Sequence, residues 1–273
     1  MVGVGLKTVV FMQGRKYTYE KLDVPTEPGA EKGTLISSVR EVGEEGGILL
    51  ASTDESKNEG VTFSDEMVSD LETLGSENSC LSELNDVSTT LKQLRIDSLK
   101  NVIIGQLNIA SLRNKFNSLV EIIHGNIDIL ILTETKLCGS FPEQQFRIPG
   151  YKKPYRNDRN KNGGGVMIYV RADIPSDILL KHKIDKNVEA IFLEINLRKN
   201  KILLVGTYHS KNKKFGTTDE VFFQQLGLAM DLYSKYDKFL IAGDFNANVN
   251  EDHSLLGEFM DDFNAKNLVK DPT

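Results

Sequence analysis

The sequence predicts an α/β protein in which strands and helices are layered as a sandwich. Two observations support this prediction. From residue 101 onward, short apolar runs alternate with segments whose apolar residues recur every three or four positions, and these are the patterns of buried strands and of amphipathic helices. Two strands in the middle of this region are separated only by the polar segment Arg198–Lys201, which favours a hairpin. Strand–helix alternation around a central hairpin is typical of layered α/β folds.

Six strands and three helices are expected in this region. The strands are Val102–Ile104, Ile129–Leu132, Gly165–Val170, Leu193–Leu197, Ile202–Val205 and Phe239–Ile241. Ser111 is placed to cap a helix after the first strand. Thr217 and Glu220 have the spacing of a capping box at the start of another helix, and a last helix is expected at roughly residues 255–266.

The charge distribution divides the chain of 273 residues near residue 100. Residues 1–100 carry 10 Lys and Arg against 18 Asp and Glu, whereas residues 101–273 carry 23 against 21. Within residues 41–90, 13 acidic residues accompany one lysine, and large apolar residues are sparse. Such a segment buries too little apolar surface to offset the entropy of ordering. We therefore expect an acidic, largely disordered region over residues 1–100 and one folded domain over residues 101–273.

Two weaker signals lie in the acidic region. The segments Val9–Met12 and Lys16–Tyr19 flank a Gln-Gly-Arg turn, which predicts a hairpin. From Leu81 to Leu94, leucine and valine recur every three or four positions, which predicts a helix that leads into the folded domain.

The composition excludes several classes of protein. Apolar residues make up 40% of the chain and charged residues 26%, as in ordinary globular proteins. No apolar run reaches the roughly 18 residues that a membrane-spanning helix needs, and the first residues lack the pattern of a secretory signal. Two cysteines, Cys80 and Cys138, cannot form a disulfide framework, which indicates a reducing compartment. We expect an intracellular protein without a membrane partner.

Polar residues suited to metal and phosphate follow four of the predicted strands. They are Asn108, Glu134, Tyr208, Asp244 and Asn246. In layered α/β folds, ligands gather where strands end, because loops there present side chains to solvent. Mg²⁺ prefers oxygen ligands and commonly takes one or two carboxylates. Each position alone has a simpler interpretation, such as a solvated carboxylate or an Asx turn. Together they predict a metal and phosphate site.

Four strings in this sequence, in this order, resemble the motifs of one family. They are Leu107–Lys115, Leu130–Thr135, Gly163–Val166 and Gly243–Asn246. The chain resembles the endonuclease/exonuclease/phosphatase superfamily, and most closely the apurinic-like endonuclease domain of non-LTR retrotransposons (long interspersed elements). The resemblance covers about residues 101–273. It implies a four-layer α/β sandwich that hydrolyses phosphodiesters with a divalent metal, Mg²⁺ or Mn²⁺.

The resemblance also implies roles for single residues. Asn108 would help to hold the metal, and Glu134 would be its direct ligand. Tyr208 would contact the scissile phosphate, Asp244 would orient or deprotonate the attacking water, and Asn246 would bond to the phosphate. In retrotransposons such a domain nicks target DNA to prime reverse transcription. The expected partners are therefore DNA and a reverse transcriptase domain in a larger polyprotein, and the expected location is the nucleus.

A basic loop offers candidate contacts to nucleic acid. The candidate residues are Arg113 of the first motif and, in the loop, Lys152, Lys153, Arg156 and Arg159. The loop cations lie among Tyr151 and Tyr155, and cations beside stacking partners suit a phosphate backbone. The alternative interpretation is a solvent-exposed loop whose charges serve solubility and bind no nucleic acid.

Two departures from the family pattern bear on activity. Tyr208 is followed by His209-Ser210-Lys211, where relatives often carry a basic residue and prolines. The family's sandwich closes with further strands that carry an Asp and a terminal Ser-Asp-His, and neither precedes Thr273. On this basis we expect a fold that is incomplete at its C-terminal end and a phosphodiesterase activity that is impaired.

The sequence leaves three functions open. The first is a DNA-nicking endonuclease domain, at least by descent. The second is a catalytically dead remnant that binds metal or DNA. The third is a phosphatase of the same superfamily that acts on inositol phosphates or lipids. The similarity of the strings at residues 108–115 and 163–166 to their retrotransposon forms favours the nuclease.

Overall fold

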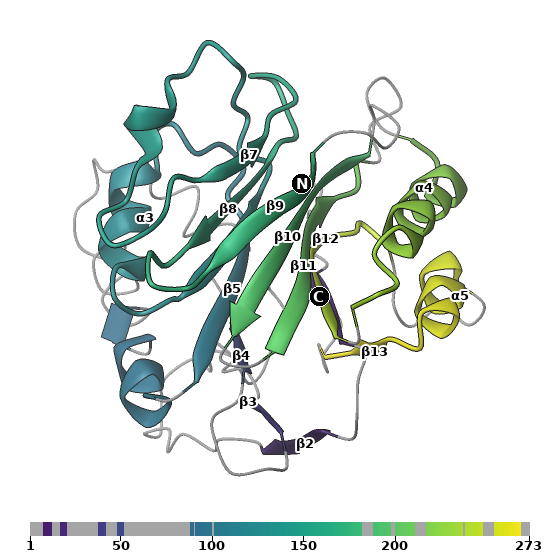
Figure 1. The fold of residues 1–273 in the computed structure, drawn as a ribbon. Coiled ribbons are helices and arrows are strands. Elements are labelled where there is room, and N and C mark those ends of the chain that lie inside the picture. The colour runs from purple at the N-terminus through teal and green to yellow at the C-terminus, as the bar shows by residue number, and fades with distance from the viewer. Residues whose placement is uncertain are drawn as a thin grey trace, which may run out of the picture.

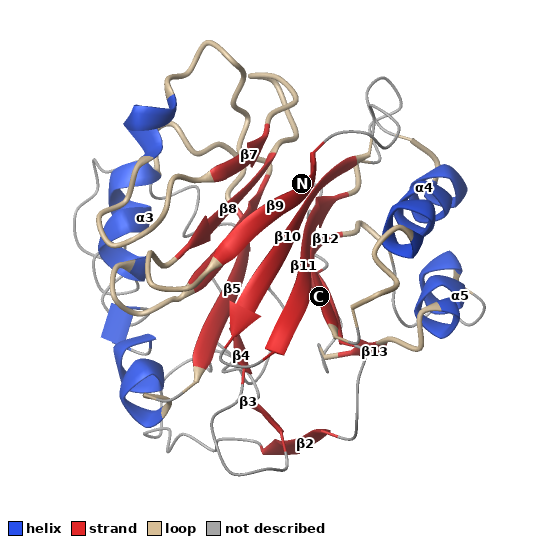
Figure 2. Ribbon diagram, viewed as in Figure 1, coloured by secondary structure: helices blue, strands red, loops and turns tan. Residues whose placement is uncertain are grey.

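The computed structural model shows two β-sheets packed face to face, with helices on both outer surfaces (Figure 1 and Figure 2). The predicted α/β sandwich is confirmed. None of the helices in the described part of the chain has the length and apolar character needed to cross a bilayer. The structure describes residues 8–12, 17–20, 38–41, 48–51, 88–89, 91–99, 101–181, 188–197, 200–210, 217–236, 238–247 and 254–268.

The first sheet has the strand order β2-β3-β4-β5-β6-β8-β7. Its strands are β2 (Tyr17–Glu20), β3 (Ser38–Glu41), β4 (Ile48–Ala51), β5 (Val102–Asn108), β6 (Ile129–Thr133), β7 (Tyr155–Asn157) and β8 (Val166–Val170). β5 and β6 run parallel, and Asn108 pairs with Thr133. The last residue of β5 therefore lies beside the chain that leads from β6 to Glu134.

The second sheet has the order β13-β1-β12-β11-β10-β9. Its strands are β1 (Thr8–Met12), β9 (Ser176–Lys181), β10 (Glu189–Leu197), β11 (Asn200–Tyr208), β12 (Phe239–Asp244) and β13 (Lys266–Asn267). β10 and β11 are antiparallel with Leu197 opposite Asn200, which confirms the predicted hairpin. β11 and β12 are parallel with Tyr208 opposite Asp244, so both strands end at one edge.

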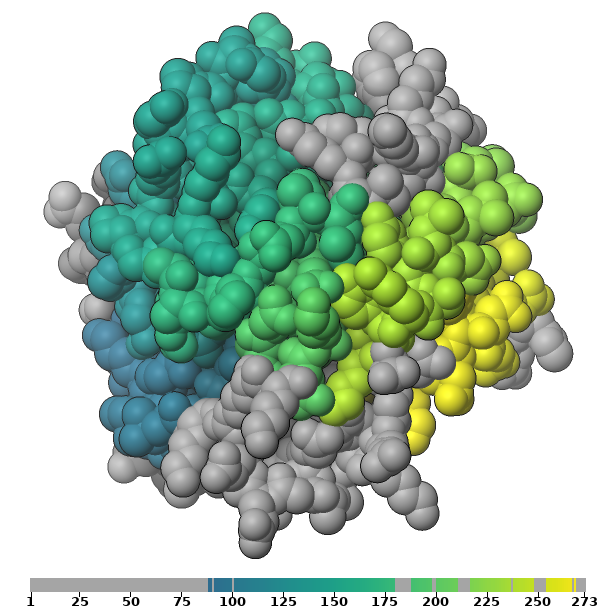
Figure 3. All heavy atoms as spheres, in the orientation of Figure 1, coloured from purple at the N-terminus to yellow at the C-terminus, as the bar shows by residue number. Residues whose placement is uncertain are grey.

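Among the described residues, three hydrophobic clusters fill the interfaces between four layers. Ile131 and Ile168 of the first sheet pack against Ile191 and Leu204 of the second. Helix α3 (Phe116–Ile123) and the helical residues 91–97 cover the outer face of the first sheet. Helices α4 (Asp219–Asp231) and α5 (Leu255–Asp262) cover the outer face of the second, and they lie side by side in Figure 3. Leu130 and Leu132 of β6 face the helical side and Ile129 and Ile131 face the second sheet, so all five residues of β6 are buried.

Two predicted helix starts are wrong. Ser111 does not cap α3, which begins later in the chain, because the intervening backbone continues along the sheet edge. The amide of Leu112 donates to the carbonyl of Thr135, and Ser111 has a φ of 129°. Helix α4 is capped by Thr218, whose side chain accepts a hydrogen bond from a first-turn amide, and not by Thr217. Because two threonines are adjacent here, the capping-box pattern locates the first residue of the helix only to within one position.

The predicted hairpin at Val9–Met12 and Lys16–Tyr19 is also wrong. β1 lies between β12 and β13 in one sheet, whereas β2 pairs with β3 in the other. Pairing with strands distant in the sequence replaced the local pairing that a short turn would permit. Most of residues 1–90 lie outside the described residues, so the disorder of residues 1–100 stays a prediction.

The predicted helix that leads into the domain is described only at its end. Residues 91–97 are helical, and Leu91 and Leu94 are buried in the cluster beneath α3. The packed core therefore includes residues on the N-terminal side of the expected boundary at residue 101.

Arg95 ties the helical residues 91–97 to the first sheet. Its Nη2 atom lies 2.7 Å from Oδ2 of the buried Asp128 and 3.0 Å from the carbonyl oxygen of Asn126. Hydrogen bonds to charged groups contribute about 1.5–3 kcal/mol, so we expect Arg95→Ala to lower the free energy of unfolding by about 2 kcal/mol in denaturant titrations. Lys92→Ala on the exposed face is the control, with an expected change below about 0.5 kcal/mol. Equal losses in both variants would contradict this docking.

Candidate functional site

The amide of Asn108 joins the two sheets at the edge where their parallel strands end. Its Nδ2 atom donates to Oδ2 of Asp244 at 3.0 Å and lies 3.4 Å from Oε1 of Glu134. The hydroxyl of Tyr208 donates to the same Glu134 oxygen at 2.8 Å. Four of the five predicted catalytic residues therefore form one hydrogen-bonded cluster. The fifth, Asn246, follows in the loop after β12 and donates from Nδ2 to the carbonyl of His209 at 2.8 Å.

Tight turns hold the ends of these strands. Oδ1 of Asn108 accepts a hydrogen bond from the amide of Ala110, and Oδ1 of Asp244 accepts one from the amide of Asn246. Glu134 and Asn246 have φ values of 52° and 48°. Residues other than glycine adopt this left-handed conformation at a cost of about 1–3 kcal/mol, and such residues cluster at functional sites. The strand ends are therefore shaped by local polar contacts that also orient the cluster.

The cluster is largely withdrawn from solvent. Asp244, Asn108 and Tyr208 are buried, whereas the side chain of Glu134 is 23% exposed. Burial, together with the charge of Glu134, raises the pKa of Tyr208 well above its ordinary range, so the phenol keeps its proton and remains a donor. Glu134 is therefore the most accessible carboxylate of the cluster.

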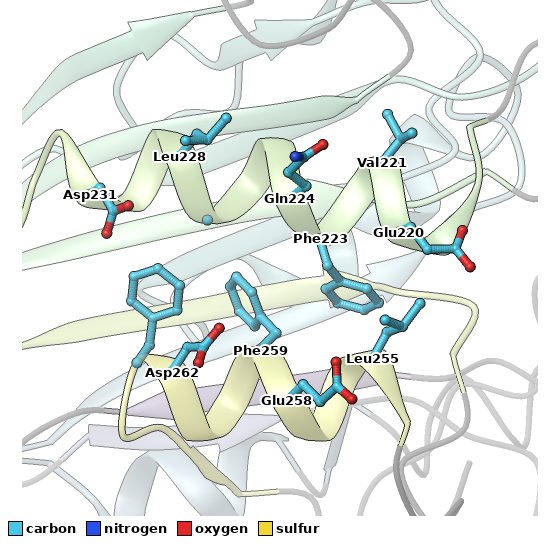
Figure 4. Close-up of a pocket in the computed structure, with 12 residues that line it drawn as sticks. Glu220, Val221, Phe223, Gln224, Leu228, Asp231, Leu255, Glu258, Phe259 and Asp262 are labelled. Atoms are coloured by element: carbon cyan, nitrogen blue, oxygen red, sulfur yellow. The ribbon is translucent and has the colours of Figure 1, made fainter.

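A cavity of about 290 Å³ opens beside this cluster. Its lining residues are Glu134, Lys136, Arg159, Asn160, Asn162, Gly163, Gly164, Tyr208, Ser210 and Asn246. A larger hollow of about 690 Å³ lies between α4 and α5, where Phe223 and Phe259 point into the space between the helices (Figure 4). That hollow contains none of the predicted site residues, so the smaller cavity is the candidate site.

The donor set of the cluster suits a divalent cation. Glu134 and Asp244 supply carboxylate oxygens that share one amide, and Mg²⁺ commonly takes one or two carboxylates together with water and phosphate oxygens. No group of three or more His, Cys, Asp or Glu gathers as a metal cage in the described ranges. The Asn108 amide donates from Nδ2 to Asp244 and lies within 3.4 Å of Glu134, so it orients the two carboxylates. Its predicted part in holding the metal stays a prediction.

One of the five predicted nucleic-acid-binding cations lines the cavity, and it is Arg159. The other four make contacts elsewhere. Lys152 donates to Oγ of Ser176 at 2.9 Å, Lys153 pairs with Glu143 at 2.5 Å, Arg156 pairs with Asp158 at 2.7 Å, and Arg113 lies over the ring of Phe141 at 5.5 Å. Lys136, which the sequence analysis missed, also lines the cavity, and its Nζ atom lies 3.7 Å from Oε2 of Glu134.

Glu189 is a second residue near the cavity that was not predicted from the sequence. It begins β10 opposite Tyr208 and is buried. Its carboxylate pairs with Nη1 of Arg159 at 2.7 Å and accepts a hydrogen bond from the amide of Gly165. Its position could have been recognised in the sequence, because a glutamate directly before the apolar run that starts at Ala190 is expected to be buried. A buried carboxylate needs a charged or hydrogen-bonding partner.

His209, which follows Tyr208, has a structural role. Its ring is fully buried, stacks on Phe222 with centroids 4.2 Å apart, and bonds through Nδ1 to the carbonyl of Phe245 at 2.8 Å. It thereby joins the loop after β11 to the loop after β12, and its own carbonyl receives the Asn246 side chain.

The stability of the protein is expected to depend on the ionisation of Glu189. Burial raises the pKa of this carboxyl to about 7, although Arg159 and the amide of Gly165 lower it. Since the folded chain holds this proton where the unfolded chain has lost it, the contribution of Glu189 to stability falls as the pH rises from about 4.5 to about 7. The fall is on the order of 3 kcal/mol.

Denaturant titrations of wild type and Glu189→Gln across this pH range measure that contribution. The wild type should lose stability relative to the variant as the pH rises. Glu194→Gln, a substitution on the same strand, should run parallel to the wild type, because hydrogen bonds from Lys201 and Tyr236 lower the pKa of Glu194. Parallel profiles for wild type and Glu189→Gln would contradict a raised pKa.

A sequence profile of the Endonuclease/Exonuclease/phosphatase family matches residues 105–259. The chain belongs to this family. The matched residues extend from β5 to α5, and they include all five predicted catalytic residues. Enzymes of this family generally use a divalent metal ion. A comparison with curated proteins finds no match.

Several solved structures share part of the fold. The 3′-5′ exonuclease NExo from Neisseria meningitidis has 22% identity and a TM-score of 0.41, over 53% of this chain and 58% of its own length. The endonuclease domain of TRAS1, a telomere-specific non-LTR retrotransposon, has 14% identity and a TM-score of 0.43, over 58% of this chain and 68% of that domain. TDP2 of D. rerio, complexed with a single-strand DNA product, has 13% identity and a TM-score of 0.34, over 71% and 62%. The chain thus spans less than two thirds of the Neisseria exonuclease.

Proposed function

We propose that this chain is a divalent-metal-dependent phosphodiesterase that nicks DNA, as the endonuclease domains of non-LTR retrotransposons do. The observation that carries this proposal is the cluster in which Asn108 joins Glu134 and Asp244 beside the phenol of Tyr208. Carboxylates can hold a metal ion and accept a proton from water, and an amide and a protonated phenol can donate hydrogen bonds to a phosphate.

The residues of the cluster have separate tasks in this proposal. Glu134, the most accessible carboxylate, would hold the metal ion with Asp244 beside it, and the bound ion would neutralise charge on the phosphate. Tyr208 would donate a hydrogen bond from its hydroxyl to a phosphate oxygen. Asp244 would orient the attacking water and accept its proton, and Asn246 would donate to the phosphate. Asn108 would hold the carboxylates of Glu134 and Asp244 next to each other.

DNA is the proposed substrate because cations line the cavity next to these groups. Arg159 and Lys136 both border it, and phosphate contacts from Arg and Lys dominate the affinity of proteins for DNA. The resemblance of residues 108–115 and 163–166 to retrotransposon forms supports the same substrate. A role in nicking chromosomal target DNA would place the protein in the nucleus, as a part of a polyprotein that includes a reverse transcriptase.

A substrate panel tests this proposal. Purified protein is incubated with supercoiled plasmid, with inositol phosphates and with a phosphomonoester, each in Mg²⁺ and in EDTA. We expect Mg²⁺-dependent conversion of supercoiled plasmid to the nicked circle, at the impaired rate that the sequence predicts. Release of phosphate from inositol phosphates without nicking would instead indicate the phosphatase. Binding of plasmid and Mg²⁺ without hydrolysis of any substrate would indicate a catalytically dead remnant.

A further inference from the structure

We infer that Glu189 is a positioning residue that holds the guanidinium of Arg159 at the cavity wall, where the guanidinium contacts a phosphate of bound DNA. This inference rests on the proposed function, because it concerns the substrate contact of the same site. It assigns a task to a buried carboxylate that takes no part in the hydrolytic cluster.

Three contacts fix the guanidinium of Arg159. Nη1 lies 2.7 Å from Oε1 of Glu189, Nε donates to the carbonyl of Gly163 at 3.0 Å, and Cζ lies 5.7 Å from the ring centroid of Tyr208. The Arg159 side chain is 13% exposed. An arginine on the surface would lose much side-chain entropy on binding a phosphate, whereas a guanidinium held in place beforehand has already lost it.

The contacts leave part of the guanidinium available to a ligand. Among the described residues, none accepts a hydrogen bond from Nη2 of Arg159, and Arg159 borders the cavity together with Glu134 and Tyr208. The fork of an arginine matches the oxygens of a phosphate. The structure thus presents a fixed cation beside the hydrolytic cluster.

The run of glycines after the basic loop is needed for this pair. A Cβ on Gly164, whose φ is 70°, would meet Nε of Arg159 and would lie 2.6 Å from Oε1 of Glu189. A Cβ on Gly165, whose φ is 96°, would meet Oγ1 of Thr135. A larger residue at Gly164 would therefore displace the pair, and one at Gly165 would displace Thr135, which gives the glycine motif a role beyond that of a turn.

Glu189 also separates the charges at the cavity. Without the carboxylate of Glu189, Arg159 would be attracted to Glu134, the acidic residue that lines the cavity. Arg159 would then compete with a metal ion for Glu134. Lys136 already lies 3.7 Å from that carboxylate. The pairing of Arg159 with Glu189 leaves Glu134 available for the metal while a cation remains for the phosphate.

DNA binding tests the phosphate contact. Affinity for a labelled duplex of about 20 base pairs is measured by fluorescence anisotropy in EDTA at about pH 8, over a series of salt concentrations. We expect Arg159→Ala to weaken binding about 10-fold and to reduce the salt slope by about one. Glu189→Gln should weaken binding by a similar factor, and the double variant should bind as weakly as Arg159→Ala alone.

The matched control for Glu189→Gln is Glu194→Gln, because Glu194 lies on the same strand and pairs with Lys201 and Tyr236. It should leave both the affinity and the salt slope unchanged. Additive losses in the double variant would overturn the inference, since a carboxylate that acts through Arg159 has no effect once Arg159 is absent.

The positioning itself is tested without DNA. In ¹⁵N-labelled protein, a slowly exchanging arginine Nε–H resonance is expected for Arg159, identified by its loss in Arg159→Lys. It should persist in Glu194→Gln and be lost in Glu189→Gln at a temperature where each variant is folded. Persistence in Glu189→Gln would overturn the inference. If the wild type fails to bind DNA but this resonance depends on Glu189, the proposed function is contradicted and the positioning is supported.

Discussion

Glu134→Ala is expected to abolish the response of this protein to divalent ions. Glu134 is the most exposed carboxylate of the cluster and accepts the hydrogen bond of Tyr208, so its loss removes the ligand through which a metal is held. In wild type, Mg²⁺ at 100 times its dissociation constant should stabilise the folded state by about 2.7 kcal/mol. Hydrolysis of plasmid should fall by about 10²–10⁴ in the variant.

Thermal unfolding in Mg²⁺, in Mn²⁺ and in EDTA measures the first effect, and plasmid nicking measures the second. Glu258→Ala is the control, because Glu258 lies on α5 at the larger hollow. It should keep both the rise in Tm with metal and the nicking rate. A rise in Tm that survives in Glu134→Ala would show that divalent ions bind elsewhere.

Asp244→Asn is expected to lose hydrolysis by about 10²–10⁴ while the protein remains folded. Asp244 accepts hydrogen bonds from the side chain of Asn108 and from the amide of Asn246 through different oxygens. An asparagine has one acceptor oxygen, so one of these two bonds is lost, at about 1–2 kcal/mol of stability. The neutral amide also cannot take a proton from water.

Single-turnover nicking and denaturant titration measure these two losses separately. Asp262→Asn, an exposed residue of α5, is the matched control and should change neither. Hydrolysis within about 10-fold of wild type in Asp244→Asn would contradict a role for this carboxylate in proton transfer.

The hydrolytic cluster could be predicted because each member follows an apolar run. Buried strands such as β6 and β12 are recognisable from local composition, and parallel strands end at one edge of a sheet. Asn108 and Glu134 were therefore expected near one another, and so were Tyr208 and Asp244. The bond from Asn108 to Asp244 joins residues in different sheets, and no local sequence pattern predicts it.

Contacts that depend on packing could not be predicted. Arg159 and Glu189 lie on separate segments, and nothing in the local pattern of either pairs them. The start of α3 was misplaced because Leu112 continues the contacts of the sheet edge, which capping rules do not include. The pairing of β1 with β12 joins residues more than 200 positions apart, and local turn signals favoured the wrong partner.

Glu134 and Asp244 are proposed to form a divalent-metal site. Anomalous diffraction from a crystal of the wild-type chain grown with Mn²⁺ would locate the bound ion. We expect an anomalous peak within coordination distance of a carboxylate oxygen of Glu134, beside Asp244, and no such peak in Glu134→Ala. An empty cluster in wild-type crystals that bind Mn²⁺ at another position would contradict it.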